Sequence, residues 1–419
     1  MTDPPGSKAR SAALRILRAV RRGSRFDVAL DREVAELSPA DRRLAHEIAA
    51  GVLRARTELD RALAPLVSGR WQKTSDDLKD LLRIGAHQLL KLSRVPRYAA
   101  VQSTVDVAKR AHGPGAARLV NAVLRRLANA VNGKIPPPAA DLAAKYSHPE
   151  WLVARWSARF GLERTEAILR HNNQRPPLTI QAVRWSEEDL LRAVSEGAVE
   201  HRRAAGGYGI VVKTRRVASL PGYAEGAFVV QDAGPARLLD HCGIPHGSLV
   251  WDACAAPGGK AALLSRRCRV LASEFRMRRL RKLRATLTRA APEVALVAAD
   301  ARRPPLPEGK FGAVLLDVPC SATGVMARHP DARWRLEPKR IEQLAALQRE
   351  ILDGAASVVK QDGLLAYITC SLEREENEDQ VEEFLERHDE FAREGDDLML
   401  LPGAEGSDGG YAARLRRVS

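Results

Sequence analysis

Two cysteines follow two predicted strands in the last third of the chain, and a thiolate is among the strongest nucleophiles that a side chain supplies at neutral pH. The first strand lies in VLLDVPCSATG, residues 314–324, and precedes Cys320. The second lies in AYITCS, residues 366–371, and precedes Cys370, 50 positions later. Parallel α/β sheets bind ligands at the carboxyl ends of their strands. We therefore expect both thiols at such an edge.

A pair of thiols suits the methylation of a ring carbon. The C5 atom of cytosine becomes nucleophilic only after a nucleophile adds to C6, and a base must later remove the C5 proton. An enzyme that methylates amino groups would instead carry Asn or Asp-Pro-Pro-aromatic where this chain has Asp317 followed by Val-Pro-Cys. One thiol to add and a second group to eliminate explains both cysteines, although their spacing does not decide which thiol adds.

Other readings of the cysteines remain open at this point. Cys320 and Cys370 would be structural if they were small buried hydrophobic residues, which is the commoner fate of cysteine. We expect Cys242 and Cys268 to be structural and Cys254 to contribute through its backbone. The five cysteines form no C-x-x-C pair, which argues against a disulfide framework and a zinc site.

A cofactor site is predicted at the same edge. The turn CAAPGGK, residues 254–260, follows a strand and leads into a helix at about Gly259, where glycines allow close approach of a ligand. Glu274, Asp300 and Asp317 end the next three strands. Neither a G-x-G-x-x-G nor a P-loop pattern is present, and three acids favour a cationic ligand. S-adenosylmethionine fits, whereas the alternative is that each acid only caps the following helix.

The surrounding pattern predicts three domains. Helical periodicity from residue 11 to about 131 indicates an all-α bundle, and the proline-rich stretch 132–141 indicates a linker. Short helical and β-rich runs mix between 142 and 228, with no legible chemistry. From residue 229, strands and helices alternate as in a doubly wound parallel sheet. The predicted boundaries are 1–140, 141–228 and 229–419.

The charge is concentrated at one end of the chain. Residues 1–140 carry 26 Lys and Arg against 13 Asp and Glu, and the other 279 residues contribute only +2 of the net charge of +15. This favours contact with a polyanion, although a solvated basic surface would give the same count. The sequence has no run of 18 apolar residues and no signal-peptide pattern, so we expect a cytoplasmic protein without a membrane span.

The N-terminal region resembles a known RNA-binding fold. RVPRYAAVQSTVDVAKRAHG, residues 94–113, and RLVNAVLRRL, residues 118–127, resemble the NusB-type helical domain of antitermination factors. This resemblance implies an RNA partner, in agreement with the charge.

Over nearly its whole length the chain resembles the bacterial 16S ribosomal RNA cytosine-5 methyltransferases of the RsmB/Sun family. The resemblance rests on WDACAAPGGK, LLDVPCSATG and YITCSLEREEN, together with HNNQRPP (171–177), RHPDARW (328–334) and LPGAEGSDG (401–409). It implies that Cys370 is the nucleophile, that Cys320 assists release of the methylated base and that Asp317 is a further catalytic residue. The implied S-adenosylmethionine contacts are Cys254, Ala255, Ala256, Pro257, Gly258, Gly259, Lys260, Glu274, Asp300 and Asp317.

The resemblance further implies 16S rRNA as substrate, and we expect a monomer without a metal ion. Two positions depart from the family pattern, Val318 in place of alanine and Gly410 in place of an aromatic residue. The competing hypothesis is an RNA-binding assembly or antitermination factor with an inactive methylase fold. Such a protein would be free to lose Cys320, Cys370, Asp317 or the glycine turn, and none is lost.

The environment of Cys370 is less clear from sequence. Ser371 is expected to cap a helix that begins near Leu372, whose dipole would favour a thiolate. Glu373, Glu375 and Glu376 would oppose it. The sequence does not give the net sign.

Overall fold

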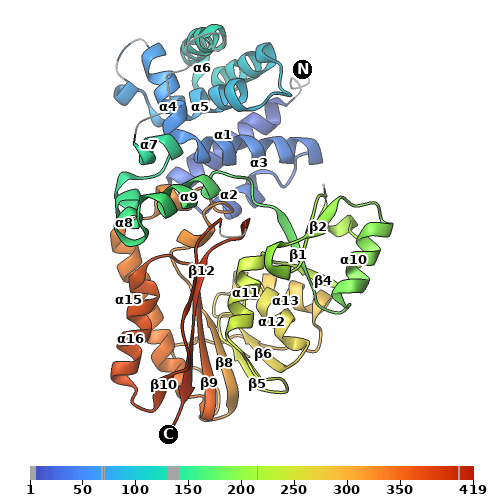
Figure 1. Ribbon diagram of the computed structural model, residues 1–419. Helices are drawn as coiled ribbons and strands as arrows, with labels where there is room; N and C mark the ends of the chain where they lie inside the picture. The colour runs from blue at the N-terminus through green and yellow to red at the C-terminus, as the bar shows by residue number, and fades with distance from the viewer. Residues whose placement is uncertain (1–5, 68, 70, 131–140, 215, 404–405) are drawn as a thin grey trace. The chain divides into compact units, whose positions relative to one another are not determined.

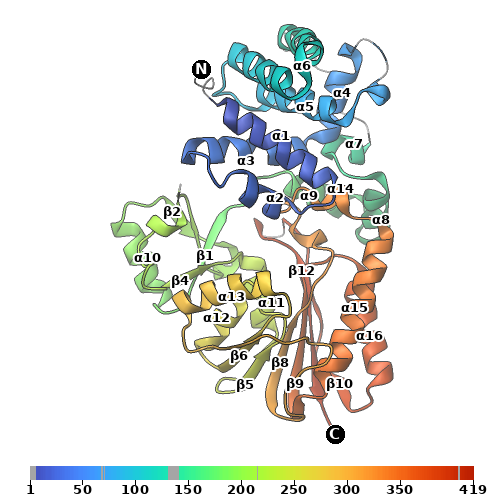
Figure 2. The ribbon, with the colours of Figure 1, turned by 180° about the vertical axis from the view of Figure 1, so that it is seen from behind.

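The computed structural model of the 419-residue chain describes residues 6–67, 69, 71–130, 141–214, 216–403 and 406–419 (Figures 1 and 2). They group into two compact units. The first comprises Met1–Gln174 with Met326–Arg335, and the second comprises Arg175–Val325 with Leu336–Ser419. Among the described residues, no helix is both long and apolar enough to cross a membrane.

The first unit is helical, as the periodicity predicts. Its α-helices are α1 (Ser7–Arg21), α2 (Phe26–Glu33), α3 (Pro39–Arg54), α4 (Arg56–Leu63), α5 (Asp76–Lys91), α6 (Arg97–Ala130), α7 (Leu142–Tyr146), α8 (Glu150–Phe160), α9 (Leu162–Asn172) and α14 (Ala332–Arg335), and its 3₁₀ turns are η1 (Ala64–Leu66) and η2 (Trp71–Lys73). Helix α6 is kinked at Gly113, whose φ of 81° is outside the helical region. Of the predicted linker, 132–140 lie outside the described residues.

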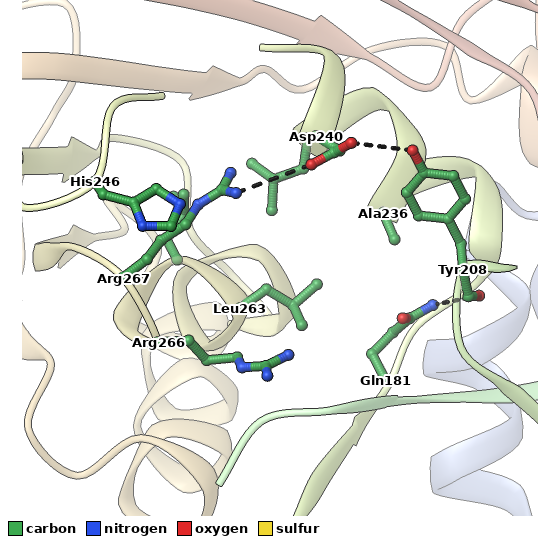
Figure 3. A pocket seen from close by; sticks show the side chains of 10 residues that line it. Gln181, Tyr208, Ala236, Asp240, His246, Leu263, Arg266 and Arg267 are labelled. Carbon is green, nitrogen blue, oxygen red and sulfur yellow. Dashed lines mark hydrogen bonds and ion pairs between the residues drawn. The ribbon is translucent and has the colours of Figure 1, made fainter. Parts of the chain in front are cut away.

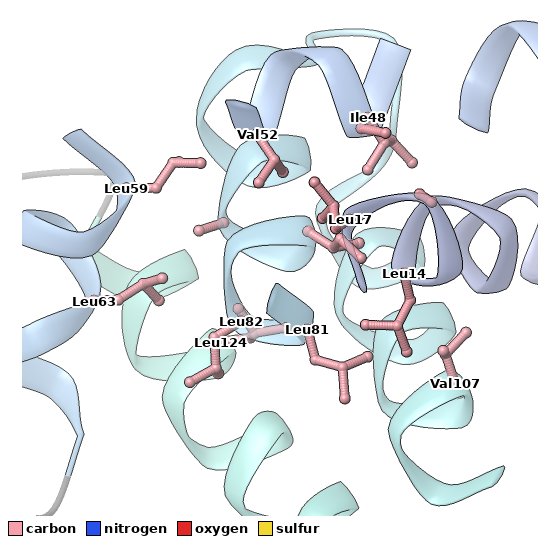
Figure 4. Close-up of a cluster of buried hydrophobic side chains, with 14 of the residues drawn as sticks. Leu14, Leu17, Ile48, Val52, Leu59, Leu63, Leu81, Leu82, Val107 and Leu124 are labelled. Carbon is pink, nitrogen blue, oxygen red and sulfur yellow. The ribbon is translucent and has the colours of Figure 1, made fainter. Parts of the chain in front are cut away.

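The apolar stripes predicted from sequence form the core of this unit. Figure 4 shows leucine and valine side chains from α1, α3, α4, α5 and α6 converging on one cluster. The α6 stripe Val120, Val123, Leu124 and Leu127 is buried, whereas Arg118 and Arg125 on its other side are exposed. Gly85 lets α5 approach α6 closely, because a Cβ at residue 85 would lie 2.3 Å from the Leu124 side chain of α6.

The second unit begins with a small antiparallel sheet in the order β2-β3-β1-β4. Its strands are β1 (Leu178–Ala182), β2 (His201–Arg203), β3 (Ile210–Val212) and β4 (Phe228–Val230), covered by α10 (Glu187–Glu196), with 3₁₀ turns η3 (Ala205–Gly207) and η4 (Val217–Ser219). The β-rich runs predicted at 208–214 and 226–232 contain β3 and β4.

The large sheet of the second unit has the order β10-β12-β9-β8-β5-β6-β7, and β11 pairs with β12. Five strands are parallel: β5 (Leu249–Asp252), β6 (Arg269–Ser273), β7 (Ala295–Val297), β8 (Phe311–Asp317) and β9 (Val359–Thr369). The remaining strands, β10 (Phe391–Arg393), β11 (Leu398–Leu400) and β12 (Gly410–Arg417), form an antiparallel edge that the sequence analysis did not predict.

Helices cover both faces of this sheet, which confirms the predicted fold class. On one face, α11 (Ala233–His241), α12 (Gly259–Ser265) and α13 (Met277–Ala290) pack on residues such as Leu315 and Ala366. On the other, α15 (Pro338–Ala356) and α16 (Glu378–Arg387) pack on residues such as Leu316. Alternate residues of each strand thus contribute to separate cores. Two 3₁₀ turns, η5 (Thr323–Val325) and η6 (Arg374–Glu376), follow β8 and β9.

The segment 326–335 packs inside the first unit although the chain on either side of it belongs to the second. The Arg333 guanidinium is buried and donates to Asn173 Oδ1 at 2.6 Å and to the Asn172 carbonyl at 2.9 Å. Burial, followed by the charge of Arg54, lowers the pKa of Arg333 to about 9, so it remains a cation at neutral pH. The motifs 171–177 and 328–334, far apart in sequence, therefore contact each other.

Asp331 in this segment caps a helix that has no side-chain cap of its own. Its Oδ2 accepts from the Phe26 backbone N–H at 3.1 Å, in the first turn of α2, and from Arg335 Nε at 2.7 Å. The N-cap residue of α2, Arg25, makes no capping bond. A buried carboxylate from residue 331 thus satisfies a helix terminus at residue 26.

We predict that Asp331→Ala lowers the free energy of unfolding of the first unit by about 1 to 3 kcal/mol, because a cap and a charged hydrogen bond are lost. Asp331→Asn, which keeps an acceptor oxygen, should lose less. Chemical denaturation followed by circular dichroism measures both. Asp106→Ala is the control in the same unit, since it removes a bond from exposed Gln102 and should change stability by less than about 0.5 kcal/mol. Equal losses in the Asp331→Ala and Asp106→Ala variants would contradict the capping role.

Candidate functional site

The structure brings the two predicted thiols together. Strands β8 and β9 pair in parallel with Asp317 opposite Ile368, so both strand ends reach the same edge. Cys320 Sγ and Cys370 Sγ lie 3.0 Å apart, and the Cys370 backbone N–H donates to Cys320 Sγ at 3.3 Å. Both cysteines are free and half-buried. One ligand atom placed beside either sulfur would therefore be within reach of the other.

The backbone around the thiols is tightly tied. Gly324 N–H donates to the Cys370 carbonyl at 2.9 Å, and Gly409 N–H donates to the Gly324 carbonyl at 2.8 Å. A Cβ at Gly324 would lie 2.6 Å from the Gly409 carbonyl oxygen, so a side chain does not fit there. The motif 401–409 thus contacts the loop that carries Cys320.

The two sulfurs have different surroundings. The pKa of Cys320 is raised well above the usual thiol value, first by its contact with the Cys370 sulfur, then by burial, and then by the negative charges of Cys370 and Glu376. Burial lowers the pKa of Lys260, but the Asp317 carboxylate and then the Cys370 thiolate more than offset this, and its net shift is upward. The Lys260 ammonium therefore interacts electrostatically with the Cys370 sulfur, and the Glu376 carboxylate interacts electrostatically with the Cys320 sulfur.

Lys260 lies in the predicted cofactor turn. Its Nζ donates to Asp317 Oδ2 at 2.7 Å, which links the start of α12 to the end of β8. Gly258 adopts φ 110°, and a Cβ at Gly259 would lie 2.1 Å from Gln231 Oε1. Gly258 is therefore required for the turn, whereas a side chain at Gly259 would have to displace the end of the Gln231 side chain. Burial, together with nearby carboxylates, raises the pKa of the Cys254 thiol, which keeps it neutral.

A fourth acid at this edge was missed by the sequence analysis. Asp252 ends β5 directly before the turn 254–260 and is completely buried, and neither carboxylate oxygen has a hydrogen-bond partner in the part of the chain that the structure describes. Burial, followed by the charge of Asp317, raises its pKa to about 8. The signal was available, because Asp252 occupies the same strand-end position as the acids that were singled out.

The other two predicted acids are already engaged by arginines. Glu274 follows β6, and its carboxylate accepts from the Arg276 backbone N–H at 2.9 Å and pairs with Arg279 at 3.1 Å. Asp300 lies three residues beyond β7 and pairs with Arg302 at 2.7 Å, which holds the pKa of Asp300 low. Each carboxylate oxygen has more than one acceptor position, so a further donor can still bind.

The helix predicted to begin near Leu372 is not there, and this expectation is wrong. Residues 374–376 form a 3₁₀ turn, and α16 begins only at Glu378. Ser371 Oγ does accept from the Glu373 N–H at 3.0 Å, but its hydroxyl donates to the Glu376 carboxylate. Asn377 Nδ2 also donates to the Ser371 carbonyl at 3.0 Å. These side-chain bonds favour a loop over a helix.

Another cysteine and a cavity of the second unit contribute no predicted site residue. Cys242 is buried and donates to the Leu238 carbonyl, in keeping with a structural role. A cavity of about 360 Å³, shown in Figure 3, lies between Tyr208, Leu263 and Arg266 and includes none of the predicted site residues. Within the described ranges, no cluster of three or more His, Cys, Asp or Glu could hold a metal ion.

Comparison with known families divides the chain into three matched segments. Residues 7–129 match the NusB family, residues 148–216 match the RsmF/B-like ferredoxin-like domain, and residues 244–416 match the 16S rRNA methyltransferase RsmB/F family. The thiols, the turn 254–260 and all four acids lie in the last segment.

Solved structures show the same fold. The protein of the crystal structure titled PH0851 is similar over 99% of both chains, with a TM-score of 0.80 and 23% identity. A methyltransferase homolog protein from Pyrococcus horikoshii covers 66% of this chain and 98% of its own, with a TM-score of 0.57 and 21% identity.

Two relatives establish the family. The probable ribosomal RNA small subunit methyltransferase B of Synechocystis sp. is 34% identical over 98% of this chain and 99% of its own length. The ribosomal RNA small subunit methyltransferase B of Vibrio cholerae is 33% identical over 97% of this chain and 96% of its own. Because the similarity spans all three matched segments and nearly every residue, the chain belongs to the RsmB/F family of rRNA methyltransferases.

Proposed function

We propose that the chain methylates C5 of a cytosine in 16S rRNA with S-adenosylmethionine as methyl donor. The observation that carries this proposal is the meeting of two thiols from separate strand ends, 3.0 Å apart, at the ligand-binding edge of the sheet. Family membership supports a methyl transfer to rRNA. The thiols support a carbon target, since methylation of an amino nitrogen needs no covalent addition.

The residues at this edge suit a cationic cofactor. The buried Asp252 side chain has no hydrogen-bond partner among the described residues, and a bound ammonium or sulfonium group would favour its ionised form. The glycines of the turn 254–260 permit close approach, and Glu274 is positioned to accept from ribose hydroxyls. We also assign Asp300 and Asp317 to this site. S-adenosylmethionine supplies the methyl group when bound.

Our proposal divides the chemistry between the thiols. The Cys370 thiolate adds to C6 of the cytosine, and the electron pair of the C5–C6 double bond becomes available at C5. After C5 is methylated, Cys320 accepts the C5 proton, the double bond reforms and the Cys370–C6 bond breaks. Burial lowers the pKa of Lys260, but Asp317 and then Cys370 raise it, which agrees with an ammonium close to the sulfur that adds. Asp317 holds Lys260 in place at 2.7 Å.

The helical unit is proposed to bind the RNA. Residues 1–140 carry a balance of +13, and Arg118 and Arg125 are exposed on the polar side of α6. Phosphate contacts give affinity without reading sequence.

We predict that Arg118→Gln with Arg125→Gln weakens binding to 16S rRNA and flattens its salt dependence. Each lost phosphate contact should reduce the slope of log K against log salt by about 0.7 to 0.9. Filter binding at several salt concentrations measures the slope. Arg192→Gln with Arg340→Gln removes the same charge from exposed positions outside the helical unit and serves as control. Identical slopes for both double variants would show that α6 does not contact the RNA.

Substitution of the two cysteines is predicted to have different effects on the covalent bond to RNA. Cys370→Ala should form no covalent bond to RNA, whereas Cys320→Ala should add and methylate but release slowly. Given S-adenosylmethionine and 16S rRNA, the Cys320→Ala protein should therefore accumulate an RNA adduct that survives denaturing gel electrophoresis. An adduct with Cys370→Ala instead would exchange the roles. Full turnover by folded Cys370→Ala would disprove covalent catalysis by that thiol, and no methyl transfer by the unaltered protein would favour the RNA-binding factor.

The raised pKa of Asp252 predicts a pH-dependent stability. Between about pH 4 and pH 8 the folded chain retains a proton that the unfolded chain has released, so this group's contribution to stability falls as pH rises. The loss is at most about 1.4 kcal/mol per pH unit. Without cofactor, Asp252→Asn should therefore gain stability relative to the unaltered protein as pH rises across this window, in denaturant titrations at pH 5 and pH 8. An equal stability difference between Asp252→Asn and the unaltered protein at both pH values would contradict a buried Asp252 without a hydrogen-bond partner.

A further inference from the structure

Glu376 is hydrogen-bonded to both loops that carry the thiols. It ends the 3₁₀ turn 374–376 and is completely buried. Its Oε1 accepts from the Ser321 backbone N–H at 2.8 Å and from Gln348 Nε2 at 3.1 Å. Its Oε2 accepts from the hydroxyls of Ser321 and Ser371. Ser321 directly follows Cys320, and Ser371 directly follows Cys370, so one carboxylate is bonded to the neighbour of each thiol.

The pattern of donors requires an acceptor at this position. A backbone N–H and an amide NH₂ can only donate, so Oε1 must be an unprotonated oxygen. Burial raises the pKa of Glu376 above its usual value, and the bonds from Ser321 and Ser371 oppose this shift without reversing it. A buried carboxylate is costly, and apolar side chains of similar volume often stabilise a core as well or better. The four donors require an acceptor oxygen at this position, but they do not by themselves require its negative charge.

Further hydrogen bonds hold Glu376 and its partners in position. Gln348 on α15 also donates to the Pro319 carbonyl at 2.9 Å, one residue before Cys320. Tyr367 on β9 donates to the Glu376 carbonyl at 2.7 Å. The negative charge of Glu376 raises the pKa of Cys320, after the larger effects of the contact with Cys370 and of burial. It also raises the pKa of Tyr367, after the larger effect of burial.

We propose that Glu376 is a positioning residue that fixes the two thiol loops against each other and disfavours negative charge on Cys320, so that the thiolate forms at Cys370. Lys260 acts in the same sense from the Cys370 side. The carboxylate thus selects which of the two adjacent sulfurs adds. The Cys320 thiol gives its proton to the ring as Cys370 adds, and the resulting Cys320 thiolate later accepts the C5 proton. This inference rests on the proposed covalent chemistry for its catalytic consequence, but its effect on Cys320 can be measured without RNA or cofactor.

The test uses Glu376→Gln, which keeps the size of the side chain and removes its charge. Alkylation of Cys320 by iodoacetamide is followed against pH in a Cys370→Ala background, with the modified peptide identified by mass spectrometry. Loss of the neighbouring negative charge should move the midpoint for Cys320 to lower pH. Glu383→Gln is the control, because this carboxylate pairs with Arg349 on α15 and not with either thiol loop. An unmoved midpoint in folded Glu376→Gln overturns the proposal.

Turnover gives the second measurement. With both cysteines present, Glu376→Gln should lower kcat by about 10-fold to 100-fold with little change in KM for RNA, because the thiols are misplaced while the binding surface is intact. Unchanged kcat overturns the positioning role. If the proposed covalent chemistry is wrong, Cys320→Ala forms no adduct, yet the alkylation midpoint still moves, so the two failures are distinguishable.

A single-bond variant keeps the proposal testable if Glu376→Gln does not fold. Ser371→Ala removes one hydroxyl from the carboxylate and retains its charge. It should lower kcat with KM for RNA unchanged, and Ser371→Thr, which restores a hydroxyl, should recover part of the loss. Full activity of Ser371→Ala in that case overturns the proposal.

Discussion

The parallel pairing of β8 with β9 is the constraint on which the site depends. The register that sets Asp317 opposite Ile368 makes both strands end at one level, and each is followed within three residues by a cysteine. A shift of two residues along the ladder would move one thiol by about 7 Å and separate the pair. Backbone hydrogen bonds, remote from any reacting atom, therefore determine the sulfur–sulfur distance.

Around that register, two polar links hold the loops at the site, one an ion pair and the other a single carboxylate. Lys260 and Asp317 link the cofactor turn to the end of β8, while Glu376 links the loops after β8 and β9. Glu376 is buried and the Lys260–Asp317 pair is half-buried, so screening by salt and water is weakest at Glu376.

Much of this could be predicted from the sequence because its periodicity is strong. The helical stripe at Val120, Val123 and Leu124 and the alternation after residue 229 both gave the correct fold class. Strand ends located Cys320, Cys370 and Lys260, since parallel strands fix where their termini lie. The hydrogen bonds of Glu376 to both thiol loops could not be predicted, because its partners Ser321 and Gln348 lie 55 and 28 residues away in sequence. Local spacing instead suggested a helix near Leu372, and side-chain bonds to the backbone prevented it.

The placement of residues 326–335 has a consequence for synthesis of the chain. Asp331 and Trp334 complete contacts with Phe26 and Leu53, made some 300 residues earlier. During translation the helical unit therefore emerges without one of its own packing elements and must wait until residue 335 has left the ribosome. Contacts of such long sequence separation close large loops and form slowly. The helical unit completes its fold only after β5, β6, β7 and β8 of the large sheet have been made.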